Sequence, residues 1–395
     1  MKKTAMKKLN WYSIVARVGL PALAAAPWAA QAQSSVKIYG AIDQGIDHVS
    51  NSGGSSLTRL RDGTYDGMFG SRWGLEGEDA LGGGLKTVFK LEAGFSAENG
   101  QSRQGGRMFG RQAYVGMSDA QWGTLTLGRQ YDSVVDYLQP VTAIGQFGGP
   151  FMRGGDIDNV ANTFRVDNAI KYASAPIGGL KFGAMASFAE GAQTGSASPS
   201  GRGMWGAGAR YAEGGLQLAA AYFHAKSPAL LFTDGNMGPN TTGAAIGAAG
   251  PFSYVGQPRT QKVFGLGGSY AFGRAGVGAN FSSSRFDGAN GTNSTVRFNN
   301  YELWAKYSPT PSTLLGAAYV FTDGKVGYSG ETPKYHQLGL MASYSLSKRT
   351  TLYSALAYQR AAGSATRADI FEFAVGSAST TNKQSLLRLG LVHLF

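Results

Sequence analysis

The stretch VKIYGAIDQGID, residues 36–47, alternates apolar and polar side chains. Val36, Ile38 and Ile42 fall on one face, and the other face carries Asp43 and Asp47. Because successive side chains of a β-strand point to opposite sides of the sheet, the pattern predicts a strand with one apolar and one charged face.

Similar segments recur along the chain, about sixteen in all, each close to the roughly 9 to 11 residues that a tilted strand needs to cross a bilayer. Tight turns alternate with long connections rich in Gly, Ser and Asn, such as 51–70, 227–258 and 361–383. Transmembrane β-barrels have this asymmetry, with short turns on the periplasmic side and long loops outside. After the N-terminus there is no apolar run long enough for a membrane-spanning helix.

Alternation alone does not separate a barrel from a soluble β-sandwich, because both have one apolar and one polar face. The segment count, the alternating connection lengths and the aromatic residues near segment ends favour a membrane barrel. These aromatic residues include Tyr172, Tyr211, Tyr307 and Tyr344. We therefore predict an all-β, transmembrane, antiparallel β-barrel over residues 33–395.

Residues 1–32 have the pattern of a secretory signal peptide: basic residues, an apolar run and Ala30-Gln31-Ala32 as the cleavage site. The alternative, a transmembrane helix over 11–26, is disfavoured because small residues and the cleavage pattern follow at once. Removing the five basic residues of this segment lowers the formal net charge from +12 to +7.

Several function classes are excluded by composition. Lys and Arg are scattered rather than gathered in a basic stripe, which argues against nucleic-acid binding. Cysteine is absent, so disulfides and thiolate metal sites cannot form. The four histidines lie in no nucleophile or metal motif, and the Gly-x-Gly triplets lie within strands rather than before a helix. We predict no catalytic residues, no metal and no cofactor.

Five motifs in this order resemble the general porins of Gram-negative outer membranes. They are VKIYGAIDQGID at 36–47, SRWGLEGE at 71–78, GRQAYVGM at 110–117, LGRQ at 127–130 and GLVHLF at 390–395. The resemblance covers the mature chain and is greatest to the proteobacterial subgroup with an LYG-type first strand and an HxF-type C-terminus. It implies a 16-stranded barrel in the cell outer membrane, a homotrimer in contact with lipid and lipopolysaccharide, and passive diffusion of small hydrophilic solutes and ions.

One long connection, residues 133–168, contains VTAIGQFGGPFMRGG at 141–155. Long connections in compact architectures are usually functional, and Gly and Pro permit sharp turns. The resemblance implies that this third external loop folds inward and narrows the pore. Related porins carry a motif resembling Pro-Glu-Phe-Gly-Gly, whereas Gln146 here replaces the carboxylate before Phe147, and Arg153 adds a positive charge.

Basic residues are predicted on the wall that faces this loop. Arg72, Arg111 and Arg165 match positions where related porins place arginines, and Lys171 shares the parity of Arg165. The alternation leaves the direction of Arg111 ambiguous, so its assignment to the lumen depends on the resemblance. A narrow passage lined by positive charge favours anions, because the field is focused there. We predict a porin that prefers anions.

Three alternatives remain open. Asp156 and Asp158 at the loop's end cancel the field if they fold back into the constriction. A solute-specific channel would hold an aromatic track or phosphate-binding arginines in its lumen. A barrel used as an adhesin or an enzyme is the third alternative.

Two residues are assigned roles outside the pore. Arg129 shares the parity of the apolar residues Leu125 and Leu127, and a charge there is costly in lipid. We predict that it lies in the subunit interface, with a position among lipid headgroups as the alternative. Phe395 ends the last strand, and the resemblance implies that the outer-membrane assembly machinery reads it as a signal.

Overall fold

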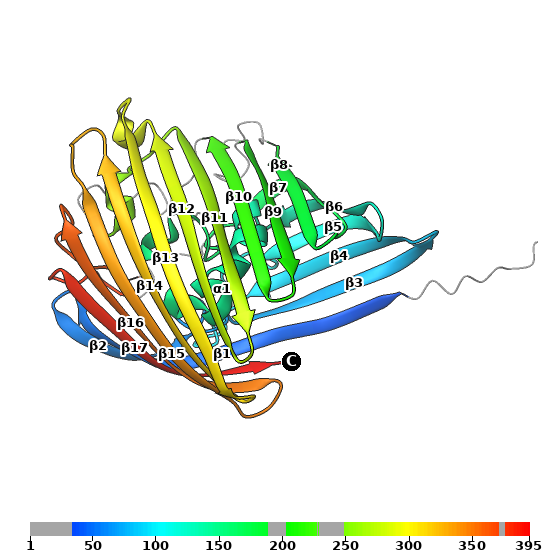
Figure 1. Ribbon diagram of the computed structural model, residues 1–395, viewed down its shortest axis with the longest axis horizontal. Helices are drawn as coiled ribbons and strands as arrows, with labels where there is room; N and C mark the ends of the chain where they lie inside the picture. The colour runs from blue at the N-terminus through cyan, green and yellow to red at the C-terminus, as the bar shows by residue number, and fades with distance from the viewer. Residues whose placement is uncertain (1–33, 189–202, 227, 229–248, 371–375) are drawn as a thin grey trace, which may run out of the picture. The chain divides into compact units, whose positions relative to one another are not determined.

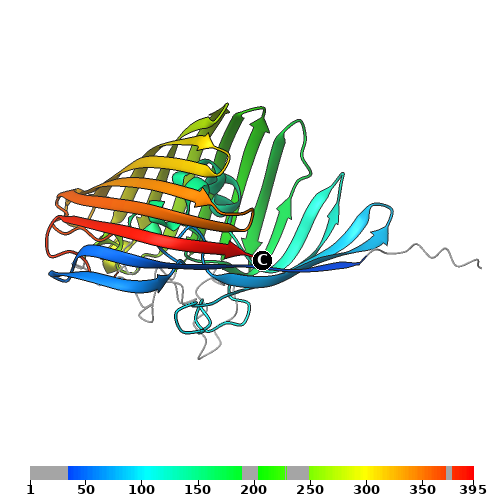
Figure 2. The same ribbon diagram turned by 90° about the horizontal axis from the view of Figure 1, so that it is seen from below.

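The computed structural model describes residues 34–188, 203–226, 228, 249–370 and 376–395. Its strands form one antiparallel sheet that closes on itself, because β1 pairs with β17 (Figures 1 and 2). Of the seventeen strands, β2 pairs with the second half of β1 and β3 with the first half, so these two share one position in a 16-stranded barrel. The predicted fold class is confirmed.

The strands are β1 Ser35–Ser52, β2 Ser55–Asp62, β3 Arg72–Gly82, β4 Leu85–Gly94, β5 Gln112–Asp119, β6 Gly123–Gln130, β7 Val166–Ala173, β8 Leu180–Ser187, β9 Met204–Glu213, β10 Leu216–Lys226, β11 Thr260–Phe272, β12 Ala275–Asp287, β13 Thr295–Thr310, β14 Thr313–Val326, β15 Pro333–Ser345, β16 Thr350–Gly363 and β17 Lys383–Leu394. Short helical turns are η1 Val134–Leu138, η2 Gln139–Val141, α1 Ala143–Phe147, η3 Gly149–Phe151, η4 Gly154–Asp156, η6 Pro251–Tyr254 and η7 Ala289–Gly291. Among the described residues, no helix has the length and apolar character needed to cross a membrane.

Short and long connections alternate as predicted, with tight turns after β3, β5, β9, β11 and β13. The prediction that the stretch 51–70 is a loop is wrong in part, because β2 occupies much of it. This strand forms a hairpin with β1 through Gly53 and Gly54, whose φ angles are positive. The strand was missed because LTRLR is short and rich in charge. The predicted signal peptide and parts of three long connections, 189–202, 229–248 and 371–375, lie outside the described residues.

The two faces of the wall differ in polarity. On β13, Tyr301 is 47% exposed and Leu303 is 63% exposed, whereas Glu302 is 2% exposed and Trp304 is 5% exposed. The exposed apolar face is the one that meets lipid in a membrane barrel. The opposite face packs against the residues between β6 and β7, which contribute Val141, Phe147 and Phe151 among others to the buried clusters.

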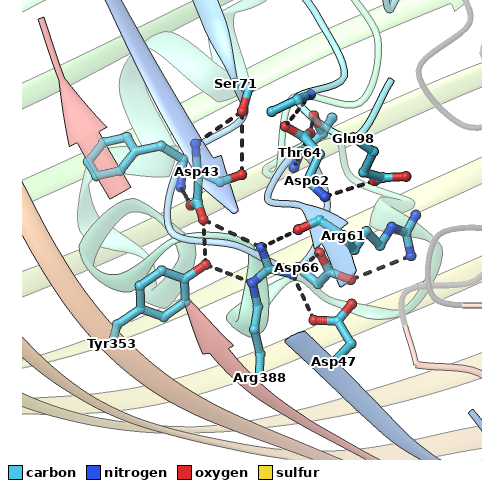
Figure 3. Close-up of polar contacts among 12 residues, drawn as sticks. Asp43, Asp47, Arg61, Asp62, Thr64, Asp66, Ser71, Glu98, Tyr353 and Arg388 are labelled. Carbon is cyan, nitrogen blue, oxygen red and sulfur yellow. Dashed lines mark hydrogen bonds and ion pairs between the residues drawn. The ribbon is translucent and has the colours of Figure 1, made fainter. Parts of the chain in front are cut away.

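The seam between the first and last strands contains a buried charge cluster, which we call the closure cluster: Asp43, Asp47, Asp66, Tyr353 and Arg388 (Figure 3). The guanidinium donates to Tyr353 Oη at 2.7 Å, to Asp47 Oδ1 at 2.7 Å and to Asp66 Oδ1 at 3.2 Å. It also donates to Asp43 Oδ1 at 3.4 Å and to the carbonyl oxygen of Arg61 at 3.1 Å. An arginine has five N–H donors, so this set of five acceptors matches its capacity.

The closure cluster also holds the segment between β2 and β3, residues 63–71. Asp66 belongs to this segment, and Asp43 accepts a hydrogen bond from the backbone N–H of Phe69 at 2.8 Å. A Cβ at Gly63 would lie 2.3 Å from Asp43 Cγ, so only glycine fits there. The segment is thereby fixed against β1 and becomes part of the cavity described next.

Candidate functional site

A cavity of about 470 Å³ lies between the wall and two segments, 63–71 and the residues after β6. The wall contributes Tyr39 from β1, Arg72 from β3, and Lys90 and Glu92 from β4. Gln139 and the stretch 144–149 line it from the other segment. Arg111 and Arg165, which directly precede β5 and β7, complete its charged lining. The cavity therefore brings together the three arginines predicted from sequence.

Glu92 is at the centre of the charged lining. One of its oxygens accepts from Arg111 Nε at 2.6 Å and from Tyr131 Oη at 3.0 Å. The other accepts from Tyr39 Oη at 2.8 Å and lies 3.7 Å from Arg72 Nε. The carboxylate thus holds both arginines at the cavity and offsets part of their charge.

Arg165 is buried, and its guanidinium carbon lies 5.7 Å from the ring centre of Tyr131. Tyr131 therefore contacts Arg111 through its hydroxyl and Arg165 through its ring. The ambiguous parity of Arg111 has a local explanation: the residue precedes the regular strand, so the outward direction of Val115 does not determine its own.

The segment between β6 and β7, residues 131–165, is held against the wall by side chains of β13 and β15. Trp304 Nε1 donates to the carbonyl oxygen of Val141 at 2.9 Å, and the backbone N–H of Ala143 donates to Glu302 Oε1 at 2.7 Å. Gln337 Nε2 donates to the carbonyl oxygen of Met152 at 2.6 Å. These contacts fix the segment on the face opposite the exposed apolar side chains.

The two predicted constriction residues of α1, Gln146 and Phe147, both line the cavity, and they differ in their other contacts. Gln146 lines the cavity and accepts from Lys306 Nζ at 2.7 Å. Phe147 is buried, with its ring centre 5.9 Å from Trp304 and 4.6 Å from Phe151. Packing of Phe147 thus places the amide of Gln146 at the cavity.

The far side of this segment touches residues 63–71. The backbone N–H of Gly149 donates to the carbonyl oxygen of Gly67 at 2.7 Å. Gly148 has a φ of 93°, and a Cβ there would lie 2.4 Å from the carbonyl oxygen of Met68. Glycine is therefore required where the two segments meet.

Arg153, the other basic residue predicted on the loop, does not line the cavity. Its buried guanidinium pairs with Asp158 and with Glu302, and it donates to Ser282 Oγ at 3.0 Å. Burial alone would lower the pKa of Arg153, but the two carboxylates raise it above its ordinary value. The residue is a structural contact between the segment and the wall.

Asp156 and Asp158 are likewise not among the residues that line the cavity. Asp156 accepts from the backbone N–H groups of Ala161 at 2.7 Å and Thr163 at 3.2 Å. Burial, and then the neighbouring charge of Asp158, raise the pKa of Asp156. Asp158 pairs with Arg153, and neither carboxylate contacts the arginines of the lining.

Comparison with known proteins identifies the family. A family model described as Gram-negative porin matches residues 19–364. The chain belongs to this family. It is 30% identical over 372 residues to an outer membrane porin protein of Bordetella pertussis, covering 84% of this chain and 90% of that protein. It is 31% identical over 348 residues to outer membrane porin protein 32 of Delftia acidovorans, covering 85% and 87%.

Solved structures agree on the fold. An anion-selective porin from Comamonas acidovorans has a TM-score of 0.73 at 23% identity, covering 92% of this chain and all of that one. OmpT of Vibrio cholerae in its trimer form has a TM-score of 0.67 at 14% identity, covering 92% of this chain and 99% of that one. The porin is thus a channel of the cell outer membrane and not an enzyme.

Other predicted residues of the porin are placed as follows. Lys171 lies outside the cavity, where its Nζ is 2.7 Å from Asp136 Oδ2. Arg129 is buried beside a bulge in β6; it pairs with Asp167 and donates to the carbonyl oxygen of Gly110 at 2.7 Å. Its charge is therefore compensated within the chain, which removes the argument that required a neighbouring subunit.

Phe395 is 43% exposed and lies beside β1. Its backbone N–H and carbonyl oxygen both bond to Gly40, at 3.1 and 3.0 Å. The terminal residue thus continues the pairing of the last strand with the first.

Sequence reasoning missed two acidic residues of the porin. Glu92 shares the polar face of β4 with Lys90, and Glu302 shares that of β13 with Lys306. Parity marked both as facing away from lipid, but it gave no sign of the arginines and backbone groups that they bind.

Proposed function

We propose that the segment 131–165 folds into the lumen of this porin, narrows the passage at the cavity and gives the channel a preference for anions. The contacts with β13 and β15 support the inward position, because they lie on the face opposite the exposed apolar side chains. Small hydrophilic solutes would pass between this segment and the wall.

The charge of the cavity lining carries the proposal. Its basic side chains are Arg72, Lys90, Arg111 and Arg165, and Glu92 is the acidic one among the described residues. The balance is therefore positive even after the Glu92 carboxylate is counted. Three acidic side chains of the segment itself have partners that do not include the lining arginines: Asp156 binds backbone groups, Asp158 binds Arg153 and Asp136 binds Lys171.

A positive lining acts most strongly where the passage is narrow. Low-dielectric walls focus the field, and the local concentration of counter-ions rises. Salt screens the effect, since the Debye length falls from about 10 Å at 0.1 M to about 3 Å at 1 M. The anion-selective character of the Comamonas acidovorans porin agrees with this sign.

The test is a reversal potential across a KCl gradient in a planar bilayer. The double variant Arg72→Gln plus Arg165→Gln should lose most of the anion preference, with a larger change near 0.1 M than near 1 M salt. Lys348→Gln plus Arg349→Gln, two exposed residues of the turn before β16, is the matched control and should keep it. Cation preference in the wild type, or an unchanged potential in the first variant, refutes the mechanism.

We also infer a homotrimer made after removal of residues 1–32, in contact with outer-membrane lipid. The trimer form of OmpT supports the oligomer, and the basic, apolar and small-residue pattern of residues 1–32 supports cleavage. Cross-linking in intact membranes should give trimers, and mass spectrometry should find Gln33 at the N-terminus. Only monomers, or an uncleaved chain, would contradict these inferences.

A further inference from the structure

Three residues on the face of β13 opposite the exposed apolar side chains hold the segment 131–165, and the third is a lysine. Glu302 and Trp304 bind backbone groups of the segment. Lys306 binds a side chain instead, because its Nζ donates to Gln146 Oε1 at 2.7 Å. Of the three, Lys306 is nearest to the tight turn after β13, and such turns are periplasmic in outer-membrane barrels.

The position of Lys306 is defined by further contacts with the wall. Its stem lies across Gly276 of β12, where a Cβ would come within 3.0 Å of Lys306 Cε. Its Nζ lies 5.9 Å from the ring centre of Trp304, and aromatic faces attract cations. The ammonium group is thereby held at Gln146, while the side chain stays partly exposed.

The charge of Lys306 has no acidic counterpart nearby. In the part of the chain that the structure describes, no carboxylate pairs with this lysine. Glu302 shares its face of β13, but the Glu302 carboxylate is bound to Arg153 and to the backbone N–H of Ala143. Lys306 therefore adds an uncompensated positive charge beside the segment.

Gln146 holds the ammonium group without cancelling its charge. The Gln146 amide has one partner at each end, because Nε2 donates to the carbonyl oxygen of Pro140 at 2.8 Å while Oε1 accepts from Lys306. A carboxylate has acceptors only, so a glutamate here would set an oxygen against the Pro140 carbonyl. The local geometry thus favours the neutral residue. Gln146 also lines the cavity, which places the ammonium group directly behind the lining.

We propose that Lys306 is a second determinant of ion selectivity, acting on a passing anion from the side of Gln146. Arg72 and Arg111 act from the wall at β3 and β5. The inference rests on the proposed passage of ions at the cavity, where positive charge raises the local concentration of anions.

The size of the effect follows from the distance between Lys306 and the cavity. A sphere of 470 Å³ has a radius of about 5 Å, so the ammonium group is about 8 Å from an ion at its centre. In about 0.1 M salt, a unit charge at that distance should change the anion-to-cation permeability ratio about twofold.

The test uses the absence of cysteine from the chain, because Lys306→Cys then offers one thiol to a water-soluble methanethiosulfonate. Reversal potentials of the whole porin are measured across a KCl gradient before and after reaction. The substitution should lower the anion-to-cation ratio about twofold, a reagent with a trimethylammonium group should restore it, and one with a sulfonate should lower it about twofold further. The control is Lys325→Cys, at an exposed lysine on the outward face of β14, and should keep its ratio with both reagents.

The outcomes separate charge from structure. Reaction changes the charge of channels that have already inserted, so a shift on reaction does not come from misfolding. A ratio that is unchanged in Lys306→Cys before and after reaction, or an equal shift in the control, overturns the inference. Lys306→Arg keeps the charge and should keep the ratio, and a loss as large as in Lys306→Cys also overturns it.

The same measurement distinguishes this inference from the proposed function. If Arg72→Gln plus Arg165→Gln loses the anion preference while the Lys306 variants keep it, the proposed function stands and the role of Lys306 is refuted. Cation preference in the wild type refutes both.

Discussion

Replacing Glu92 with glutamine should make the channel more selective for anions. The substitution keeps the size of the side chain and removes the acidic charge from the cavity lining. Arg72 and Arg111, which this carboxylate holds at 3.7 and 2.6 Å, then act without compensation.

The cavity volume sets the magnitude. A sphere of 470 Å³ has a radius of about 5 Å, and a unit charge at that distance from an ion contributes about 0.8 kcal/mol at the dielectric constant of water. Losing a negative charge favours an anion and disfavours a cation by this amount each. The anion-to-cation ratio should therefore rise by a factor of about 10 to 20.

Reversal potentials at two salt levels measure this ratio. The increase should be clear near 0.1 M KCl and should largely disappear near 1 M, where charges are screened within about 3 Å. Glu78→Gln is the control, because Glu78 pairs with Lys86 at 2.9 Å and does not line the cavity. An unchanged or lower anion preference in Glu92→Gln, or an equal effect in the control, would refute the electrostatic account.

Three other variants test separate contacts. Asp66→Asn removes the charge that ties residues 63–71 to Arg388, so open-channel current noise in 1 M KCl should at least double; noise equal to that of the wild type would contradict the tie. Burial raises the pKa of Asp132 from 3.8 to about 6. The protonated carboxyl group therefore stabilises the folded state fully below pH about 4, and this contribution is lost as pH rises through about 6. The melting temperature should fall over that range and fall less in Asp132→Asn, whereas equal slopes would rule out this titration. Deleting Phe395 should lower membrane insertion severalfold without reducing secretion, which fractionation measures, and normal insertion would exclude a signal in this residue.

The barrel was predictable because its wall obeys a simple periodicity. Lipid on one side and polar contacts on the other impose a period of two, which is visible in residues 36–47 and in β13. The interruption between β2 and β3 was not predictable in this way. Residues 63–71 leave the sheet where Gly63 meets Asp43, and such a contact leaves no periodic trace in the sequence.

Matched positions in the sequence pointed to three arginines that the structure brings together, whereas the pairing of charges was not visible in the sequence; that these arginines form the pore constriction stays a prediction. Arg72, Arg111 and Arg165 line the cavity as expected from the resemblance. Arg153 carries the same charge but binds Asp158 inside the protein. Sequence gives the sign of a charge, whereas its effect on a passing ion depends on which neighbour the folded chain places beside it.

The closure cluster joins the two ends of the chain, and this has a consequence for the order of assembly. Asp43, Asp47 and Asp66 belong to the first part of the chain, while Arg388 arrives with the last strand, opposite Asp47. A closing strand displaced by two residues would present Leu386 or Gly390 to Asp47, leave the buried Asp43 without its cation, and leave Asp47 and Asp66 with only Arg59 and Arg61. The cost of burying unpaired charge penalises such a misaligned barrel far more than lost backbone pairing would. The charge of Arg388 thus favours the barrel in which the first and last strands are correctly aligned over one in which they are misaligned.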